Sequence, residues 1–318
     1  MALDLLAPAS SLHPRGTGRP TAWDLILAVL RELQGSKRYQ ARFLLHALLR
    51  RSVLQRYTTG AISPSLAAYL SQRPELCGAL IWPYQCSSWP ATERFARIES
   101  HFSVLDTAPH EFRFAVSELL LLADLSDCSP GVRLVLEQPK WLFREGLLAL
   151  SLFLHAERVY SLSFSLQRQG TETQVFVGGL QGHRSELALA QYRQLTEDFH
   201  GMRPRDLLID MLKACAPLLG VTRILAVADE HRCFRHPYFG RAPHPGMLAN
   251  YNDIWSERGG KRIAATHFEL PLAPSIRPLE SVPSRKRALY RRRNGMLSSL
   301  FERVQDGTER NLISFDAA

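Results

Sequence analysis

The sequence lacks the local patterns by which many enzymes are identified. It contains no Walker phosphate-binding loop, no glycine-rich dinucleotide fingerprint and no Gly-x-Ser-x-Gly elbow for a nucleophilic serine. Its five cysteines form no Cys-x-x-Cys pair, which argues against a disulfide framework and favours reduced thiols. Residue spacing alone therefore names no reaction, and it identifies no substrate or oligomeric state.

Long apolar runs are absent too. No segment reaches the length of about 18 apolar residues that a membrane-spanning helix needs. The most apolar stretch, Gly146 to Ala156, is interrupted by Ser151. The N-terminal residues 1–20 have no apolar core of the kind found in a secretory signal. Together with the reduced cysteines, these observations predict a cytoplasmic protein without a transmembrane segment.

The spacing of apolar residues predicts an α/β (α+β) fold whose N-terminal part is helical. Helices are predicted from Arg38 to Tyr57, from Pro90 to Phe102 and from Glu111 to Asp124. The hydrophobic content of 46% is enough for a sizeable core. The predicted organisation is a loose tail at residues 1–20, a helical region at 21–130, a mixed α/β domain at 131–305 and a flexible tail at 306–318.

Strand patterns begin after residue 130. Tyr160–Leu166 alternates strictly, and the turn at Gln169–Thr171 joins it to Gln174–Leu180 as a predicted hairpin. The pair Gly178 and Gly179 is compatible with a bulge, but a tight turn into the next segment is the favoured interpretation. Further along, the pattern predicts helices at 186–199 and 203–219, a strand at 222–228, a short helix at 251–257, a strand at 265–270 and a helix at 284–304.

Positive charge is concentrated near the C-terminus. The chain has a formal net charge of +9, and the segment Val282–Arg293 carries six cations and no acid. Such a patch can attract phosphates, nucleic acid or anionic headgroups, but charge alone does not choose among them.

Four short segments resemble the signatures of one family. They are Phe176–Gly182; Thr196 with His200–Pro204; Tyr251, Trp255 and Gly259–Gly260; and Pro283–Arg293. In this order they are similar to the VirK/YbjX family of bacterial proteins, and the resemblance covers about residues 30–305. It implies a role in virulence, tolerance of host antimicrobial peptides and envelope stress, and it implies no agreed reaction.

The order of hairpin, helix and strand at 160–229 is also similar to that of acyl-CoA N-acyltransferases of the GNAT type. There, a helix N-terminus holds the cofactor pyrophosphate, since its amide groups are unpaired and its end is partly positive. Gly201, Arg203 and Arg205 precede or open the corresponding helix here, although the usual glycine-rich cofactor loop is missing. The alternative is an ordinary capped helix with two solvated arginines.

Three residues are candidates for acid–base chemistry. His231 follows Asp229 at the carboxyl end of a predicted buried strand, a place where ligand sites collect, and Asp229 is suited to orient it. His200 precedes the Gly201 turn and has a similar claim. For each histidine the alternative is a loop residue without a catalytic role. A zinc site built from His231, Cys233, His236 and His244 is disfavoured by their spacing, so we predict no metal.

The basic helix has an apolar stripe that is expected to dock on the body of the protein. The stripe consists of Leu289, Met296, Leu297, Leu300 and Val304. The cations proposed as ligand-binding residues on this helix are Arg285, Lys286, Arg287, Arg291 and Arg292.

Two functional hypotheses remain open at this point. In the first, the cations near Arg203 and on the basic helix converge on one anionic small molecule, such as an acyl-CoA or the phosphopantetheine of an acyl carrier protein. In the second, the chain is a non-enzymatic regulator that binds RNA or a protein partner through the arginine helix. Few aromatic residues interleave with these arginines, so base stacking has weak support.

Overall fold

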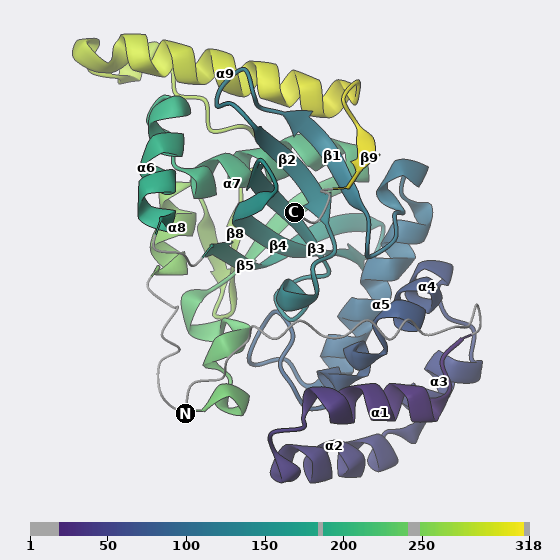
Figure 1. The fold of residues 1–318 in the computed structure, drawn as a ribbon. Helices are drawn as coiled ribbons and strands as arrows, with labels where there is room; N and C mark the ends of the chain where they lie inside the picture. Colours follow the sequence, from purple (N-terminus) through teal and green to yellow (C-terminus); the bar gives the residue numbers. More distant parts are fainter. Residues whose placement is uncertain (1–18, 184–186, 241–248, 315–318) are drawn as a thin grey trace.

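A mixed β-sheet forms the centre of the computed structural model, which describes residues 19–183, 187–240 and 249–314 (Figure 1). Within these residues the sheet has nine strands in the order β7-β8-β6-β5-β4-β3-β2-β1-β9. Neighbouring strands are antiparallel except β5 and β6, which are parallel. The strands are β1 (Leu119–Asp124), β2 (Val132–Glu137), β3 (Leu148–Leu154), β4 (Glu157–Gln169), β5 (Glu172–Gly182), β6 (Val221–Val227), β7 (Lys261–Ala264), β8 (His267–Leu270) and β9 (Asn311–Ile313).

Helices at the N-terminal end form a group that contacts the sheet through its last member. They are α1 (Ala22–Glu32), α2 (Lys37–Leu49), α3 (Arg51–Thr59), α4 (Pro64–Gln72) and α5 (Ala91–Thr107). Of these, α5 lies directly on β4. The helices α1 and α2 lie at the end of the molecule opposite the C-terminal helix α9 (Arg287–Asp306) (Figure 1).

The expected mixed α/β fold is confirmed, and so is the central hairpin. Strands β4 and β5 pair from Tyr160 to Gln169 around the predicted turn. The chain then forms α6 (Ala188–Asp198) and α7 (Pro204–Cys215), and it returns as β6 beside β5. Pro204 occupies the first turn of α7, where its missing N–H breaks no helical hydrogen bond. The short helix α8 (Tyr251–Glu257) follows β6, as predicted.

Three sequence-based assignments were wrong. The segment predicted as a helix from Glu111 to Asp124 ends in strand β1, because Leu119–Leu121 pairs with β9 on one side and with β2 on the other. For the same reason Asn311–Ile313, expected in a flexible tail, is ordered as β9. The helix predicted from Arg38 to Tyr57 is two helices that meet at Arg50, whose φ of −117° is not helical. Non-local strand pairing decided the first two cases.

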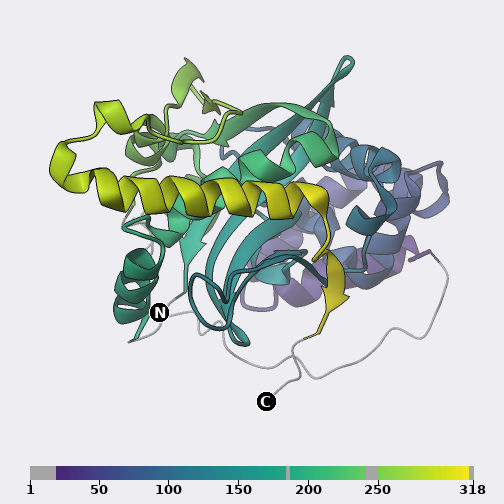
Figure 2. The same cartoon turned by 90° about the horizontal axis from the view of Figure 1, so that it is seen from above.

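The apolar stripe of α9 packs on the body as predicted. Met296, Leu297, Leu300 and Val304 are buried, and α9 contacts α7 and β1. Figure 2 shows α9 stretched across the molecule. Its last turn is fixed by Arg303, which donates to Glu309 at 2.7 Å and to Asp127 at 3.2 Å. This docking places the basic start of α9 beside the start of α7.

Truncation of this stripe is expected to destabilise the protein. Leu297 is 0% exposed, so the Leu297→Ala variant should lower the free energy of unfolding by about 3 kcal/mol through lost burial and a cavity. Leu312→Ala is the matched control, because Leu312 is 52% exposed, and it should change stability by less than about 0.5 kcal/mol. Urea denaturation measures both, and equal losses would show that α9 does not dock through this stripe.

Candidate functional site

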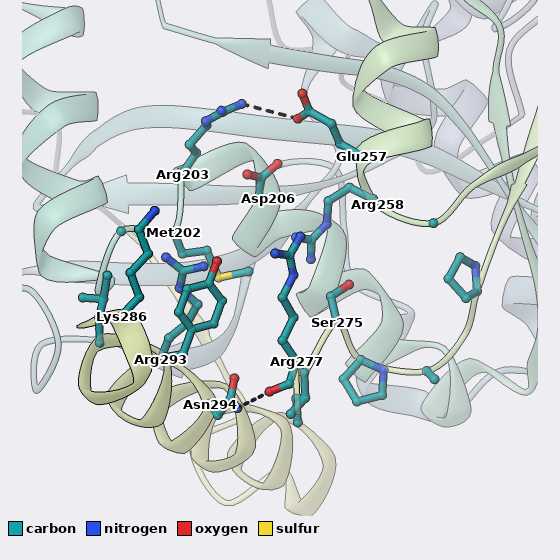
Figure 3. A pocket seen from close by; sticks show the side chains of 18 residues that line it. Met202, Arg203, Asp206, Glu257, Arg258, Ser275, Arg277, Lys286, Arg293 and Asn294 are labelled. Carbon is teal, nitrogen blue, oxygen red and sulfur yellow. Dashed lines mark hydrogen bonds and ion pairs between the residues drawn. The ribbon is translucent and has the colours of Figure 1, made fainter. Parts of the chain in front are cut away.

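A pocket of ≈ 810 Å³ lies where four segments meet. Its walls come from the start of α7, the end of α8, the segment 271–277 after β8, and the first half of α9 (Figure 3). Helix α7 lies between β5 and β6 in the chain, and α8 lies between β6 and β7, so both helices are connected to neighbouring strands at one side of the sheet. The segment 271–277 is a loop.

The walls are predominantly positive. Five cations line the pocket, namely Arg203, Arg258, Arg277, Lys286 and Arg293. Two carboxylates, Asp206 and Glu257, also line it. The carboxylates are paired, since Glu257 contacts Arg203 at 3.5 Å and Arg205 at 2.7 Å. Arg258 bonds to the buried Asp210, which also pairs with the buried Lys213 at 3.2 Å. Within the described part of the chain, Arg277 and Lys286 have no acidic partner, so their charge is available to a ligand.

Arg293 is held in place by the backbone of the segment that precedes α7. Its Nε and Nη2 atoms donate to the carbonyl of His200 at 3.0 and 2.8 Å, and its guanidinium stacks on Tyr290 at 4.5 Å. A β-carbon at Gly201 would lie 2.8 Å from Arg293 Nη2, and the φ of Gly201 is +78°. The left-handed backbone conformation therefore favours glycine here, and a β-carbon would also displace the guanidinium of Arg293. A neutral carbonyl leaves the arginine charge uncompensated.

The structure brings together some of the predicted ligand-binding residues. Gly201, Arg203 and Lys286 line the pocket. Arg205 instead bridges Asp206 at 3.3 Å and Glu257, below the wall. The remaining four candidates, Arg285, Arg287, Arg291 and Arg292, are exposed on α9 or just before it and do not line the pocket.

Three wall cations were missed by sequence reasoning. Arg293 belongs to the basic run, but only its position relative to the apolar stripe of α9 sets it on the pocket side. Arg258 follows α8 and Arg277 lies in a proline-containing segment without periodicity. No pattern in the sequence marks these two, because the fold brings them to the pocket over long chain distances.

The predicted acid–base residues lie elsewhere. Asp229 is buried and bonded to Arg235, and it accepts from the Tyr251 amide at 3.1 Å, so it fixes the start of α8. The His231 carbonyl accepts from the Ser87 amide at 2.7 Å, away from the pocket wall. His200 is closer to the pocket through its contact with Arg293. Burial, with Arg292 and Arg293 nearby, lowers the pKa of His200. A catalytic role for these residues stays a prediction.

Of the residues considered for zinc, His231, Cys233 and His236 are described, and they do not form a group that could hold a metal ion. Across the described ranges, no group of three or more His, Cys, Asp or Glu side chains could hold a metal ion. His244 lies outside the described residues. Cys233 is buried, and this burial raises the pKa of its thiol well above the usual range.

A buried carboxylate lies behind the glycine pair of β5. The register between β4 and β5 shifts at Gly178, so the pair forms a bulge inside the strand and not the favoured turn. A β-carbon at Gly178 would overlap the Glu145 carbonyl, and one at Gly179 would overlap the Glu145 side chain. The glycines therefore admit Glu145 to the core, where it is 1% exposed.

Glu145 has few partners for a buried charge. Gln181 donates to Oε2, whereas Oε1 has no hydrogen-bond partner among the described residues. Burial raises the pKa of Glu145 to about 7, although Arg232 and Gln181 oppose this shift. Arg232 in turn lies 3.8 Å over the ring of Tyr251.

Tyr251 closes the gap between the two parallel strands. Pairing between β5 and β6 ends at Val177, and β5 continues to Gly182 paired with β4 on its other edge. The Tyr251 hydroxyl donates to the Leu180 carbonyl at 3.0 Å and accepts from the Leu180 amide at 2.6 Å. On the edge of β5 that β6 leaves unpaired, a side chain from α8 thus satisfies the amide and the carbonyl of Leu180.

The chain belongs to a bacterial family described as "Protein of unknown function (DUF535)", whose model matches residues 33–306. This confirms the VirK/YbjX resemblance. The chain is 28% identical over 245 residues to the uncharacterized protein YbjX of Escherichia coli, covering 74% of this chain and 73% of YbjX. An uncharacterized protein of Haemophilus influenzae is 29% identical over 150 residues, 47% of this chain and 48% of the relative. No solved structure matches the chain significantly. No helix in the described ranges is long and apolar enough to cross a membrane.

The buried position of Glu145 predicts a pH-dependent stability. Because its pKa rises from 4.5 to about 7 on folding, the stabilising contribution is complete below pH 4.5 and is lost as pH rises through 7. The Glu145→Gln variant should remove up to about 3 kcal/mol of this dependence.

Chemical denaturation between pH 4.5 and pH 7 measures this effect. The exposed carboxylate Glu302 on α9 provides the control, and Glu302→Gln should leave the wild-type pH profile unchanged. A Glu145→Gln profile as steep as that of the wild type would show that the carboxylate is not the titrating group.

Proposed function

We propose that the protein binds a phosphate-bearing small molecule in the pocket between α7, α8 and α9. The observation that carries the proposal is that Arg277, Lys286 and Arg293 line one hollow, and none of the three forms an ion pair with a described carboxylate. Like charges held together repel, and a multivalent anion relieves that repulsion while it gains charge-assisted hydrogen bonds. Guanidinium groups suit phosphate oxygens in particular.

The donor we favour is an acyl-CoA or the phosphopantetheine of an acyl carrier protein. The crossover from β5 through α7 to the parallel strand β6 supports a GNAT-type arrangement, and the wall beside Gly201 and Arg203 is the start of that helix. In this proposal the pyrophosphate lies against the start of α7 and the cations of α9. Tyr251 fills the gap between β5 and β6, so the acyl arm reaches that gap only if Tyr251 moves.

Acyl transfer would connect the pocket with the expected physiological role. The family resemblance implies a function in virulence, envelope integrity and resistance to host antimicrobial peptides, and acyl chains are building blocks of envelope lipids. Of the two histidines proposed as base, His200 is the better placed, because its carbonyl holds the pocket residue Arg293. Its lowered pKa keeps the imidazole neutral, as a general base requires.

A non-enzymatic regulator is the second candidate. Arg285, Arg287, Arg291 and Arg292 are exposed and lie off the pocket, so a small ligand in the pocket leaves them unused. A nucleic acid or an acidic protein could occupy them. RNA binding of this kind should weaken steeply with rising salt.

Isothermal titration with coenzyme A and with pantetheine tests the first proposal. Coenzyme A carries the phosphates and should bind, whereas pantetheine lacks them and should give no heat. Replacing Arg277 and Lys286 by Gln should raise the Kd for coenzyme A by at least about tenfold, since each lost charged hydrogen bond costs about 1.5 kcal/mol or more.

The matched control replaces Arg285 and Arg291 by Gln, which removes the same charge from α9 and its approach outside the pocket. Its Kd for coenzyme A should remain within about twofold of the wild type, because distant exposed charges are screened. If both variants bind coenzyme A equally weakly, the loss of affinity follows from the lower net charge and not from contacts in the pocket. Absence of binding to coenzyme A and to an acyl carrier protein would remove the acyl-donor proposal.

A further inference from the structure

The hairpin formed by α1 and α2 exposes an unusual amount of apolar surface. Of the thirteen large hydrophobic side chains that are exposed among the described residues, six lie on these two helices: Trp23, Leu27, Leu44, Leu45, Leu48 and Leu49. Trp23 and Leu49 are each 71% exposed. Surface leucines are common singly, but a cluster of this kind marks a contact surface.

The leucines of α2 form one stripe on its outer face. Positions 44, 45, 48 and 49 lie one turn apart, so their side chains share a side of the helix. The opposite side carries Phe43 and Ala47, which are buried in the core. The outer leucines are therefore not needed to hold α2 on the protein, and their exposure needs another explanation.

Cations flank this stripe at both ends. Residues 37–59 contain six Lys or Arg residues and no Asp or Glu. Lys37, Arg38 and Arg42 precede the leucines, and Arg50 and Arg51 follow them. None of these five cations forms an ion pair with another described residue. The outer face of α2 is thus apolar at its centre and positive at its ends, whereas α1 also carries the exposed acids Asp24 and Glu32.

We propose that the outer face of α1 and α2 docks on the surface of an anionic lipid bilayer. Leucines lying along a helix can enter the boundary between headgroups and acyl chains, while long Lys and Arg side chains reach the lipid phosphates. The hairpin lies at an extremity of the molecule, opposite α9, so it meets a flat surface without obstruction from the body (Figure 1). The phosphate pocket would then remain accessible on the other side.

A lipid surface accounts for these features better than a protein partner does. A helix face of leucines with cations at its ends suits an anionic bilayer. Lipid headgroups are mobile, so they can pair with these cations without a fixed arrangement of partners. A folded acidic partner needs directional polar contacts as well, and the outer face of α2 offers few between its cations.

Vesicle flotation with the full chain tests this inference. Vesicles of phosphatidylcholine with about 30% phosphatidylglycerol should bind the protein, and vesicles of phosphatidylcholine alone should bind at least about tenfold less. Replacing Leu45, Leu48 and Leu49 by Gln should lower the partition coefficient about tenfold or more. A second variant with Arg38 and Arg42 replaced by Gln should lower it severalfold at low salt and less at high salt.

The matched control carries Leu187→Gln and Leu189→Gln, which remove leucines that are 67% and 70% exposed at α6. It should bind vesicles as the wild type does. Equal losses in the α2 and α6 variants, or no binding to anionic vesicles, would overturn the proposal. Light scattering without vesicles measures the oligomeric state. If the wild type is a dimer and the α2 leucine variant is a monomer, the surface is an interface between two copies of the chain, and the lipid proposal is wrong. The Kd for coenzyme A should be unchanged in every variant. The test of the lipid surface is therefore independent of the test of the pocket.

Discussion

The packing of α9 against α7 is the interaction on which the pocket depends. Apolar side chains on one side of α9 are buried, and they hold the basic start of the helix beside the start of α7. Arg293 then bonds to the His200 carbonyl, and Gly201 leaves room for it. Hydrophobic burial thus offsets the repulsion among cations that would otherwise separate the two segments.

The fold buries one carboxylate in its core but leaves the arginines of the pocket in contact with water. Near Gly178 a single carboxylate is buried almost without partners, and its pKa shifts toward neutrality. Around the pocket the arginines remain part-exposed and keep their charge in contact with water. The first arrangement suits a group whose protonation changes with pH, and the second suits a site that attracts an anion from solution.

Local sequence patterns were sufficient for much of the fold. The strict alternation of Tyr160–Leu166 predicted β4, and Pro204 with the following apolar residues predicted the start of α7. Three of the four family signatures, among them the basic run, contribute residues to the pocket wall. The helix predicted from Glu111 to Asp124 failed over Leu119–Asp124, because its leucines are compatible with either a helix or a buried strand, and pairing with β2 and β9 decides.

Sequence reasoning was weaker for the site itself. Of its candidates, Gly201, Arg203 and Lys286 line the pocket, and their neighbours along the chain carry recognisable signals. It missed Arg277, whose position follows from the path of a loop after β8. It also chose His231 and Asp229 from their place at a strand end, whereas Asp229 fixes the start of α8 through the Tyr251 amide.

A crystal structure of the protein soaked with coenzyme A tests the central claim most directly. The account predicts pyrophosphate density in the hollow between Arg203, Arg277 and Lys286, with the α9 packing unchanged. Density along Arg285, Arg291 and Arg292 with an empty hollow would contradict it.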